Sequence, residues 1–343
     1  MNTLQPGRWS DPARVRDVAV RALSERGVPA AGEIVDVLLE TSMYGVHTHG
    51  IRLLAAFLDE LDRGVAQAAA QPRIIADTGP VVQLDAGDAL GVAAALHATA
   101  LVTERAGRYG VGVVGVRRSN HFGAAGAYAR RIAAAGLAGI VTTAAAARVA
   151  PFGGVDPFFG TNPIAVAFGD DFCLDMATSQ VCFNEIKARR SAGAPLSPGW
   201  AVDAAGRGTE DPADAVALSP LGGYKGQGLA MATTVLTAVL VGGALDPEME
   251  HIGQSPPGSG RGVAHLLIAL DPAALGGRDQ ARNSMERLVD ALRGATPADP
   301  GRPVLIPGDP QREHARRQRA GGLESDAATA DLLDRLTPVG VPG

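Results

Sequence analysis

The stretch that decides the fold is Val116–Phe168, VRRSNHFGAAGAYARRIAAAGLAGIVTTAAAARVAPFGGVDPFFGTNPIAVAF. It combines a polar turn at Ser119–His121, a helix rich in small residues, an apolar strand and two turns rich in Pro, Gly and Asn. Turns of this kind between regular elements are where a scaffold holds polar side chains toward a ligand. We therefore expect this stretch to carry part of a binding site.

The strand expected just before it contains Gly110, Gly112 and Gly115, which formally match the GxGxxG fingerprint of dinucleotide-binding folds. That fingerprint needs a strand before the glycines, a helix opening at them and an acidic residue about twenty positions later. Here a helical pattern precedes the glycines, and the region of the acidic residue holds Arg130. We therefore interpret the glycines as small residues of a buried strand.

Helical and strand patterns divide the chain. Before residue 70 apolar residues recur at helical spacing, and the first helix is predicted to start at Ser10-Asp11-Pro12. From residue 71 onward, short apolar strands alternate with helical segments, a pattern that favours a mixed α/β sheet. We predict an α/β fold with a non-Rossmann mixed sheet and a domain boundary near residue 70.

The composition is that of an ordinary globular protein, with 46% hydrophobic and 20% charged residues among 343. The net charge of -5 provides no field that would attract nucleic acid or an anionic membrane, so neither is expected as a partner. Cys173 and Cys182 lie in an apolar context, which implies no disulfide framework and fits a reducing compartment such as the cytoplasm.

No secretory or membrane segment is expected. The N-terminal residues lack the apolar segment of a secretory signal. The longest uncharged run, Gly226–Leu245, contains glycines, threonines and a glutamine, and so predicts a buried helix rather than a membrane span.

His47, His49 and His121 lie in polar turns flanked by glycine, whereas the other histidines lie in regular elements or polar segments. A histidine can donate or accept a proton near neutral pH, so His49 and His121 are candidate acid–base residues. His47 and His49 could be half of a metal site, but no carboxylate or cysteine at ligand spacing accompanies them, so no metal is expected. Ser119 and Thr48 leave acyl transfer as a weak alternative, since nothing resembles the GxSxG motif.

Lys225 stands among glycines at the expected start of a helix, in LGGYKGQGLA. The helix dipole disfavours a cation there, while glycines permit close backbone approach and free amides bind anions. Lys225 is therefore a candidate phosphate contact, with an exposed lysine after a flexible turn as the alternative.

Seven motifs follow one another in an order and spacing that resemble the malate/L-lactate dehydrogenase-like family. They span about residues 10–325 and read THGIRLL, SNHFGAAGAYA, APFGG with GTNPIAVAF, LDMATS, GWAVD, PLGGYKGQGLA and PGDP. This non-Rossmann group includes ureidoglycolate dehydrogenase, sulfolactate dehydrogenase, diketogulonate reductase and piperideine-2-carboxylate reductase. Any one motif is weak, whereas seven in register are specific.

The resemblance implies a cytoplasmic, homodimeric oxidoreductase that uses NAD or NADP and transfers a hydride between nicotinamide and a small 2-hydroxy or 2-oxo acid. A helical domain built from residues 1–70 and about 295–343 would accompany a mixed α/β cofactor domain at residues 71–294. One alternative is reduction of a cyclic-imine carboxylate, as in other members of the same family. A weaker alternative is a protein that binds nicotinamide without catalysis.

The resemblance also implies site residues. His49 matches the family's proton donor, and His121 lies in the same site and has the acid–base role in some members. Thr48, Arg52, Thr161 and Asn162 are expected to bind substrate, Arg52 because a guanidinium fork matches a carboxylate. Cofactor contacts are expected from three segments, namely Cys173, Leu174, Asp175, Met176, Ala177, Thr178 and Ser179, then Tyr224 and Lys225, and finally Gly308, Asp309 and Pro310.

Three positions depart from the family pattern. Many relatives carry the arginine four residues after the histidine, where this chain has Leu53, and many have Ser in place of Thr48. Many also have Thr-Asn-Ser where this chain has Thr143-Ala144-Ala145, which removes polar groups expected near the nicotinamide or substrate. These departures predict an unusual substrate or, alternatively, lost activity.

Overall fold

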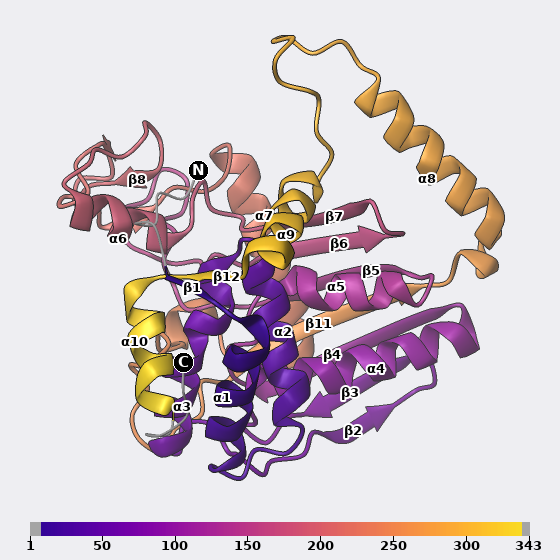
Figure 1. The fold of residues 1–343 in the computed structure, drawn as a ribbon, viewed down its shortest axis with the longest axis horizontal. Helices are drawn as coiled ribbons and strands as arrows, with labels where there is room; N and C mark the ends of the chain where they lie inside the picture. Colours follow the sequence, from indigo (N-terminus) through magenta and orange to yellow (C-terminus); the bar gives the residue numbers. More distant parts are fainter. Residues whose placement is uncertain (1–7, 338–343) are drawn as a thin grey trace.

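The computed structural model describes residues 8–337, which are built around a seven-stranded mixed sheet with helices on both faces (Figure 1). The strand order is β2-β3-β4-β11-β5-β6-β7, and only β3 and β4 pair in parallel. The strands are β2 (Arg73–Asp77), β3 (Val81–Asp85), β4 (Val111–Ser119), β5 (Ala138–Thr143), β6 (Ile164–Phe168), β7 (Phe172–Met176) and β11 (Val263–Leu270). The predicted non-Rossmann mixed sheet is confirmed.

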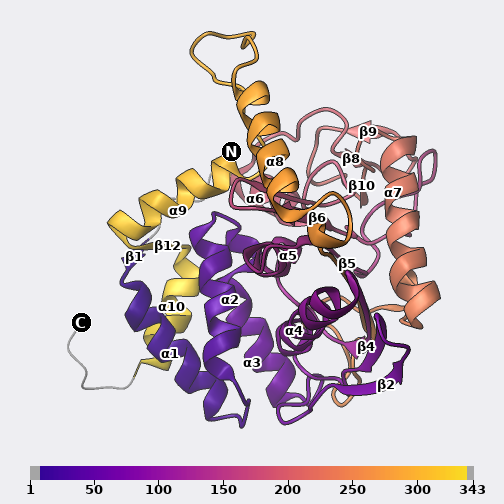
Figure 2. The same ribbon diagram turned by 90° about the vertical axis from the view of Figure 1, so that its right-hand side faces the viewer.

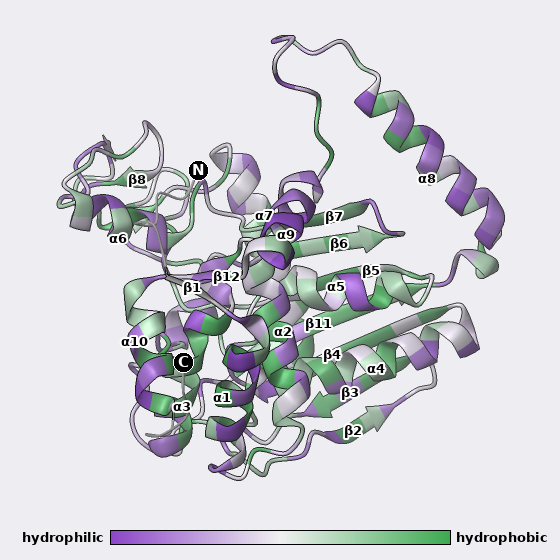
Figure 3. Ribbon diagram, viewed as in Figure 1, coloured by the Kyte–Doolittle hydropathy of each residue, from purple (hydrophilic) through white to green (hydrophobic). Residues whose placement is uncertain are grey.

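The centre of the sheet is apolar because helices cover it on both sides. Strand β11 reads VAHLLIAL and is buried along most of its length, as expected of a strand covered on both faces. Helices α4 (Gly91–Tyr109) and α5 (Ala125–Ala134) lie on one face, and α7 (Tyr224–Thr234) lies on the other (Figure 2). Figure 3 shows the resulting run of apolar residues along β3, β4 and β11.

The glycines of β4 serve helix packing. A Cβ at Gly112 would lie 2.3 Å from the carbonyl oxygen of Val102 in α4, and a Cβ at Gly115 would lie 2.8 Å from a methyl group of Val241. Because helices press on the strand from both sides at these points, any larger residue would force them apart. The interpretation of these glycines as small residues of a buried strand is therefore confirmed.

The N-terminal and C-terminal segments form a helical layer beside the sheet (Figures 1 and 2). The first helix begins where predicted, because the Asp11 carboxylate accepts a hydrogen bond of 3.1 Å from the amide of Ala13. Strand β1 (Arg8–Ser10) pairs antiparallel with β12 (Leu323–Ser325), which joins the two ends of the chain. The helices are α1 (Pro12–Ser24), α2 (Ala31–Met43), α3 (Leu54–Asp62), α9 (Asp309–Gly321) and α10 (Ala327–Leu336). The division into two domains at residues 70 and 295 stays a prediction, since one hydrophobic core contains side chains from both parts.

The run Gly226–Leu245 is helical, but the expectation that it is buried is wrong for the chain taken alone. Helix α7 continues into a π-helical turn at Val235–Val239, and Val239 and Leu240 are 62% and 69% exposed. Within residues 8–337 no helix is long and apolar enough to span a membrane.

The remaining elements lie at the periphery. Helix α8 (Arg278–Arg293) projects away from the body of the molecule in both ribbon views (Figures 1 and 2). Helix α6 (Phe183–Ala192) accompanies a small sheet of β8 (Ala201–Val202), β9 (Gly208–Thr209) and β10 (Ala217–Leu218). Short 3₁₀ turns occur at His47–His49, Ile51–Leu53, Asp246–Glu248 and Pro272–Ala274.

Candidate active site

A cavity of about 450 Å³ lies where the helical layer meets the β7 side of the sheet. Its walls come from the turn at residues 44–49, the turn at residues 121–125, strand β7, helix α6 and the turn at residues 308–312. Its size is typical of a small-molecule site. Of the predicted residues, the cavity brings together Thr48, His49, His121, Thr161, Cys173, Asp175, Met176, Ala177 and Gly308.

His49 and His121 face each other in this cavity. Their ring centroids lie 5.7 Å apart, and the ring planes are inclined by 28°. His49 ends the 3₁₀ turn, where the next residue is glycine because a Cβ at Gly50 would lie 2.1 Å from the hydroxyl oxygen of Ser42. His121 follows the end of β4. The two candidate histidines therefore come from different parts of the chain and meet in one site.

The hydrogen bonds of the two rings differ. The backbone amide of Gly123 donates to Nδ1 of His121 over 3.1 Å, so the neutral ring carries its proton on Nε2. Nδ1 of His49 lies 2.8 Å from the hydroxyl oxygen of Thr48, which can either donate or accept. Protonating Nδ1 of His121 would place its N–H against the amide N–H of Gly123, which is unfavourable. His49 can gain or lose a proton and keep its hydrogen bond to the Thr48 hydroxyl. Of the two, His49 is the ring better suited to cycle a proton.

Burial favours the neutral form of both histidines. Burial lowers the pKa of His49 to about 4. Burial lowers the pKa of His121 well below its ordinary value, and the neighbouring His49 and Arg261 lower it further. An anionic ligand would oppose these shifts, because it favours the charged imidazolium.

Cationic side chains gather near His251 on the same cavity wall. The Arg148 guanidinium stacks on the Phe183 ring at 4.0 Å from its centroid, and the Lys187 ammonium lies 5.2 Å from the same centroid. Within residues 8–337 neither Arg148 nor Lys187 forms an ion pair with a carboxylate. Burial, followed by Arg148, lowers the pKa of His251 to about 4. Two uncompensated cations on one cavity wall favour an anionic ligand.

Sequence reasoning missed this cationic wall. Lys187 is followed closely by Arg189 and Arg190, a pattern typical of a solvated helix face, and His251 lies in a polar segment of the sequence. One signal was present, because Arg148 is the only charged residue between Arg131 and Asp156.

Strand β7 and the tail turn, two of the segments predicted to contact the cofactor, lie side by side. The amide of Cys173 donates to the carbonyl of Pro307 over 3.1 Å, which brings Gly308 to the strand edge. Asp309 lies outside the cavity lining and pairs with Arg293 and Arg312 at 2.9 and 2.6 Å. Among the described cavity-lining residues, four further predicted contacts are also absent, namely Leu174, Thr178, Ser179 and Pro310.

Thr178, which was predicted to contact the cofactor, instead forms hydrogen bonds that hold the backbone after β7. The hydroxyl of Thr178 donates to the carbonyl of Thr161 over 3.1 Å, and the carbonyl of Thr178 accepts from the amide of Leu221 over 2.9 Å. The second bond brings the start of α7 close to this segment. Tyr224 and Lys225 themselves point to solvent and do not line the cavity.

Arg52 and Asn162 make other contacts than those expected. Arg52 pairs with Asp326 at 3.0 Å and lies outside the cavity lining. Asn162 is fully buried, and its amide oxygen accepts from the amide of Ala145 over 3.1 Å. Its amide nitrogen donates to the carboxylate of Asp246 over 2.7 Å, and that carboxylate also accepts from Gly160 over 2.8 Å. Asn162 thus holds the turn, and Thr161 alone of the pair lines the cavity.

The alanine pair that departs from the family pattern is divided between two surroundings. Ala144 is buried against Met249 in a small apolar cluster. Ala145 lines the cavity and contributes no polar side chain there. Only the second alanine therefore changes the chemistry of the cavity wall.

Comparison with known proteins is consistent along the whole chain. Residues 11–334 match the family described as malate/L-lactate dehydrogenase. The chain is 34% identical over 325 residues to (2R)-3-sulfolactate dehydrogenase (NADP(+)) of Chromohalobacter salexigens, covering 92% of this chain and 94% of that protein. It is 32% identical over 302 residues to Delta(1)-pyrroline-2-carboxylate reductase of Ancylobacter novellus, covering 86% of each. A solved dehydrogenase from Sinorhizobium meliloti has a TM-score of 0.88 at 33% identity, with 97% of this chain and 98% of that chain covered.

Proposed function

The chain belongs to the malate/L-lactate dehydrogenase family of NAD(P)-dependent oxidoreductases, and from this membership we propose a specific reaction. The protein transfers a hydride between nicotinamide and a small 2-hydroxy or 2-oxo acid, and His49 moves the accompanying proton. The observation that carries the proposal is the facing pair His49 and His121 in a cavity whose wall holds uncompensated cations.

The lining of the cavity fits a nicotinamide cofactor. Met176 and Ala177 offer an apolar surface for a flat ring, and at the start of β7 the turn at Gly308 and the cation Arg312 lie beside Cys173. These residues would hold NAD or NADP, which supplies the hydride. The protein supplies alignment, exclusion of water and the proton.

The proposed proton transfer uses the one ring whose hydrogen bond survives a change of charge. When a substrate hydroxyl is oxidised, His49 accepts its proton, and when a carbonyl is reduced, His49 returns it. In the neutral ring that accepts the substrate proton at Nε2, Nδ1–H of His49 donates to the Thr48 hydroxyl oxygen, and this hydrogen bond is kept when Nε2 becomes protonated. His121, fixed by Gly123, presents an Nε2–H donor that can orient the substrate oxygen.

The substrate class follows from the charges. A 2-hydroxy acid brings one carboxylate, and Arg148 and Lys187 together offer two positive charges near Phe183. A second anionic group on the substrate, such as another carboxylate or a sulfonate, would neutralise the remaining charge. We therefore include in the proposal that dianionic 2-oxo acids are preferred over monoanionic ones.

Reduction of a cyclic-imine carboxylate is the second candidate. It is favoured by the similarity to the pyrroline-2-carboxylate reductase and by Ala145, which leaves that part of the wall without a polar group. A flat ring with a single carboxylate would occupy such a wall without leaving a polar group unpaired.

The test is a substrate screen with purified protein. NADH and NADPH binding is titrated by fluorescence, and oxidation of the bound form is then followed with oxaloacetate, 3-sulfopyruvate, pyruvate and pyrroline-2-carboxylate. We expect turnover with a dianionic oxo acid. Turnover with the imine alone would establish the second candidate, and binding without any turnover would indicate a nicotinamide-binding protein without catalysis.

We also propose that the protein is a homodimer. Apolar side chains are exposed along α7 and the π-helical turn, among them Tyr224, Met231, Val239 and Leu240 at 70%, 57%, 62% and 69%. Helix α8 projects from the body and buries only Val289 among its described residues, although most helical stability normally comes from packing. Exposed patches of this kind mark interaction sites, and a second copy would cover them.

The dimer makes a direct prediction. Light scattering after gel filtration should give twice the chain mass for the wild type and the single mass for Leu240→Glu, because a buried charge disrupts an apolar contact. Val216→Glu, at an exposed apolar residue outside α7, should remain dimeric. A monomeric wild type would contradict the proposal.

The proposed location is the cytoplasm. Cys173 and Cys182 are both free, as expected where thiols stay reduced. A reducing compartment also holds the soluble nicotinamide cofactors that the proposed reaction needs.

A further inference from the structure

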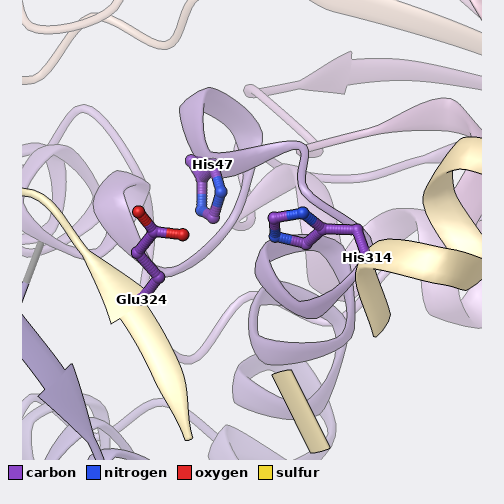
Figure 4. Close-up of side chains that lie close together, drawn as sticks. All are labelled: His47, His314 and Glu324. Atoms are coloured by element: carbon purple, nitrogen blue, oxygen red, sulfur yellow. The ribbon is translucent and has the colours of Figure 1, made fainter. Parts of the chain in front are cut away.

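A second cluster of ligating side chains lies behind the turn that carries His49. It consists of His47 from the 3₁₀ turn, His314 from α9 and Glu324 from β12, and one ligand atom from each lies within 4.8 Å of the others. Figure 4 shows the two rings and the carboxylate converging on one point. The His47 and His314 ring centroids are 5.2 Å apart, with the rings inclined at 74°.

Two of these side chains lack conventional partners. Within residues 8–337 the ring of His47 and the carboxylate of Glu324 form no hydrogen bond and no ion pair with any side chain. The carboxylate oxygens therefore lie more than 4.0 Å from the nitrogens of both rings, too far for direct pairing. Ligands of a tetrahedral zinc ion at about 2.1 Å lie about 3.4 Å apart, so the three groups need to close by about 1 Å around an ion.

The surroundings hold His314 in place. Gly45 adopts a φ of 81°, and a Cβ there would lie 3.0 Å from Cγ of His314, so the ring packs directly on the glycine turn. The Gln318 amide nitrogen lies 3.0 Å from Nε2 of His314, and the Gln318 amide oxygen accepts from the backbone amide of Glu324 over 2.7 Å. Gln318 thus links the His314 ring to the backbone of Glu324. The Arg317 guanidinium lies 3.3 Å from Nδ1 of His314, so an ion bound to this ring takes the place of either Arg317 at Nδ1 or Gln318 at Nε2.

Both rings favour the form that binds metals. Burial, followed by His314, lowers the pKa of His47, and burial, followed by Arg317, lowers the pKa of His314. Glu324 faces both rings and opposes these shifts, as Asp326 does for His47. A neutral imidazole is the metal ligand, and a set of two histidines and one carboxylate with an open position suits Zn²⁺.

We propose that His47, His314 and Glu324 bind one zinc-class divalent ion, with water as the fourth ligand, and that this ion ties the C-terminal segment to the turn carrying His49. His314 and Glu324 lie more than 250 positions after His47 in the sequence, so local spacing could not identify them as its partners. They also separate His47 from His49, which faces His121 instead. The site is therefore structural or regulatory and distinct from the proposed proton-transfer pair.

The ion would act on the cavity through short connections. Gly45, Val46, Thr48 and His49 line the cavity on the His47 side, and Arg312 lines it from the first turn of α9. Because His314 lies on α9 and His47 in the turn, an ion between them would hold these two walls at a fixed separation.

The test uses the full chain after removal of metals with EDTA. Isothermal titration with ZnCl₂ should give one site per chain, and CoCl₂ should produce the visible absorption band of tetrahedral cobalt. His314→Gln and Glu324→Gln should each weaken zinc binding by about 100-fold and remove the zinc-dependent rise in melting temperature. His97→Gln, at an exposed histidine on α4, should bind zinc as the wild type does.

Two results would overturn the proposal. The first is a wild type with no stoichiometric zinc binding. The second is wild-type zinc affinity in both His314→Gln and Glu324→Gln with their circular dichroism unchanged. Zinc would then be binding to other histidines on the surface. Because binding is measured without catalysis, either result is independent of the proposed oxidoreductase reaction.

Discussion

Replacing His49 with alanine is expected to lower kcat at least 100-fold while the protein still binds NADH or NADPH, in line with general acid–base contributions of roughly 10² to 10⁴. The reason is that His49 is the ring able to change its charge and keep its hydrogen bond to Thr48. The measurement is steady-state turnover of the accepted substrate together with fluorescence titration of the cofactor. Bound cofactor with lost turnover assigns the effect to chemistry rather than to folding.

His121 provides the comparison. His121→Gln removes the Nε2–H donor fixed by Gly123, and we expect a rise in KM with a smaller fall in kcat, because this residue orients the substrate without cycling a proton. If His121→Gln loses 100-fold in kcat while His49→Ala loses less than tenfold, the two roles are exchanged.

The same assignment predicts a pH dependence. The pKa of His49 is about 4, so the proton-accepting neutral ring predominates above that pH and the proton-donating ring below it. For oxidation of the hydroxy acid, kcat/KM should rise as the pH increases through about 4 and then level off. For reduction of the oxo acid, it should fall as the pH rises above that value. A wild-type pH dependence that persists unchanged in His49→Ala would exclude this ring as its source.

The fold could be predicted from local patterns because helix spacing, strand length and turn residues are all local properties. The rejected glycine fingerprint shows this well, since Gly112 and Gly115 lie inside β4 and pack against α4 and Val241. The exposed surface of α7 could not be predicted, because apolar residues indicate burial without indicating whether the same chain or another one covers them.

Site residues that lie in glycine-flanked turns could be predicted from the sequence. Contacts between segments far apart in the chain could not. His49 and His121 stand in glycine-flanked turns, and the structure brings them together. Asn162 was expected at the substrate, yet it is tied to Asp246, a residue from far along the chain that no local signal singles out. The pairing of Arg52 with Asp326 is equally non-local. Burial and pairing are properties of the assembled fold, so one sequence cannot assign them.

Replacing Arg148 with methionine is expected to raise KM for a dianionic oxo acid roughly 10- to 100-fold with a smaller change in kcat. A hydrogen bond to a charged group contributes about 1.5–3 kcal/mol, and 1.4 kcal/mol corresponds to about tenfold. Methionine keeps apolar contact with Phe183 and removes only the charge and the donors. Lys187→Met should have a smaller effect, because its side chain is more exposed to solvent.

The matched control is Arg52→Met, since Arg52 is the arginine that the sequence offered for the substrate carboxylate because of its guanidinium fork. Arg52 already pairs with Asp326 at 3.0 Å, so its loss should change KM less than about threefold, the small effect expected for a partly exposed ion pair. The preference for dianionic over monoanionic oxo acids should collapse in Arg148→Met and persist in Arg52→Met. The guanidinium that binds the second anionic group of the substrate determines the charge selectivity. If the preference collapses in Arg52→Met and persists in Arg148→Met, Arg52 binds that group, and Arg148 only packs on Phe183.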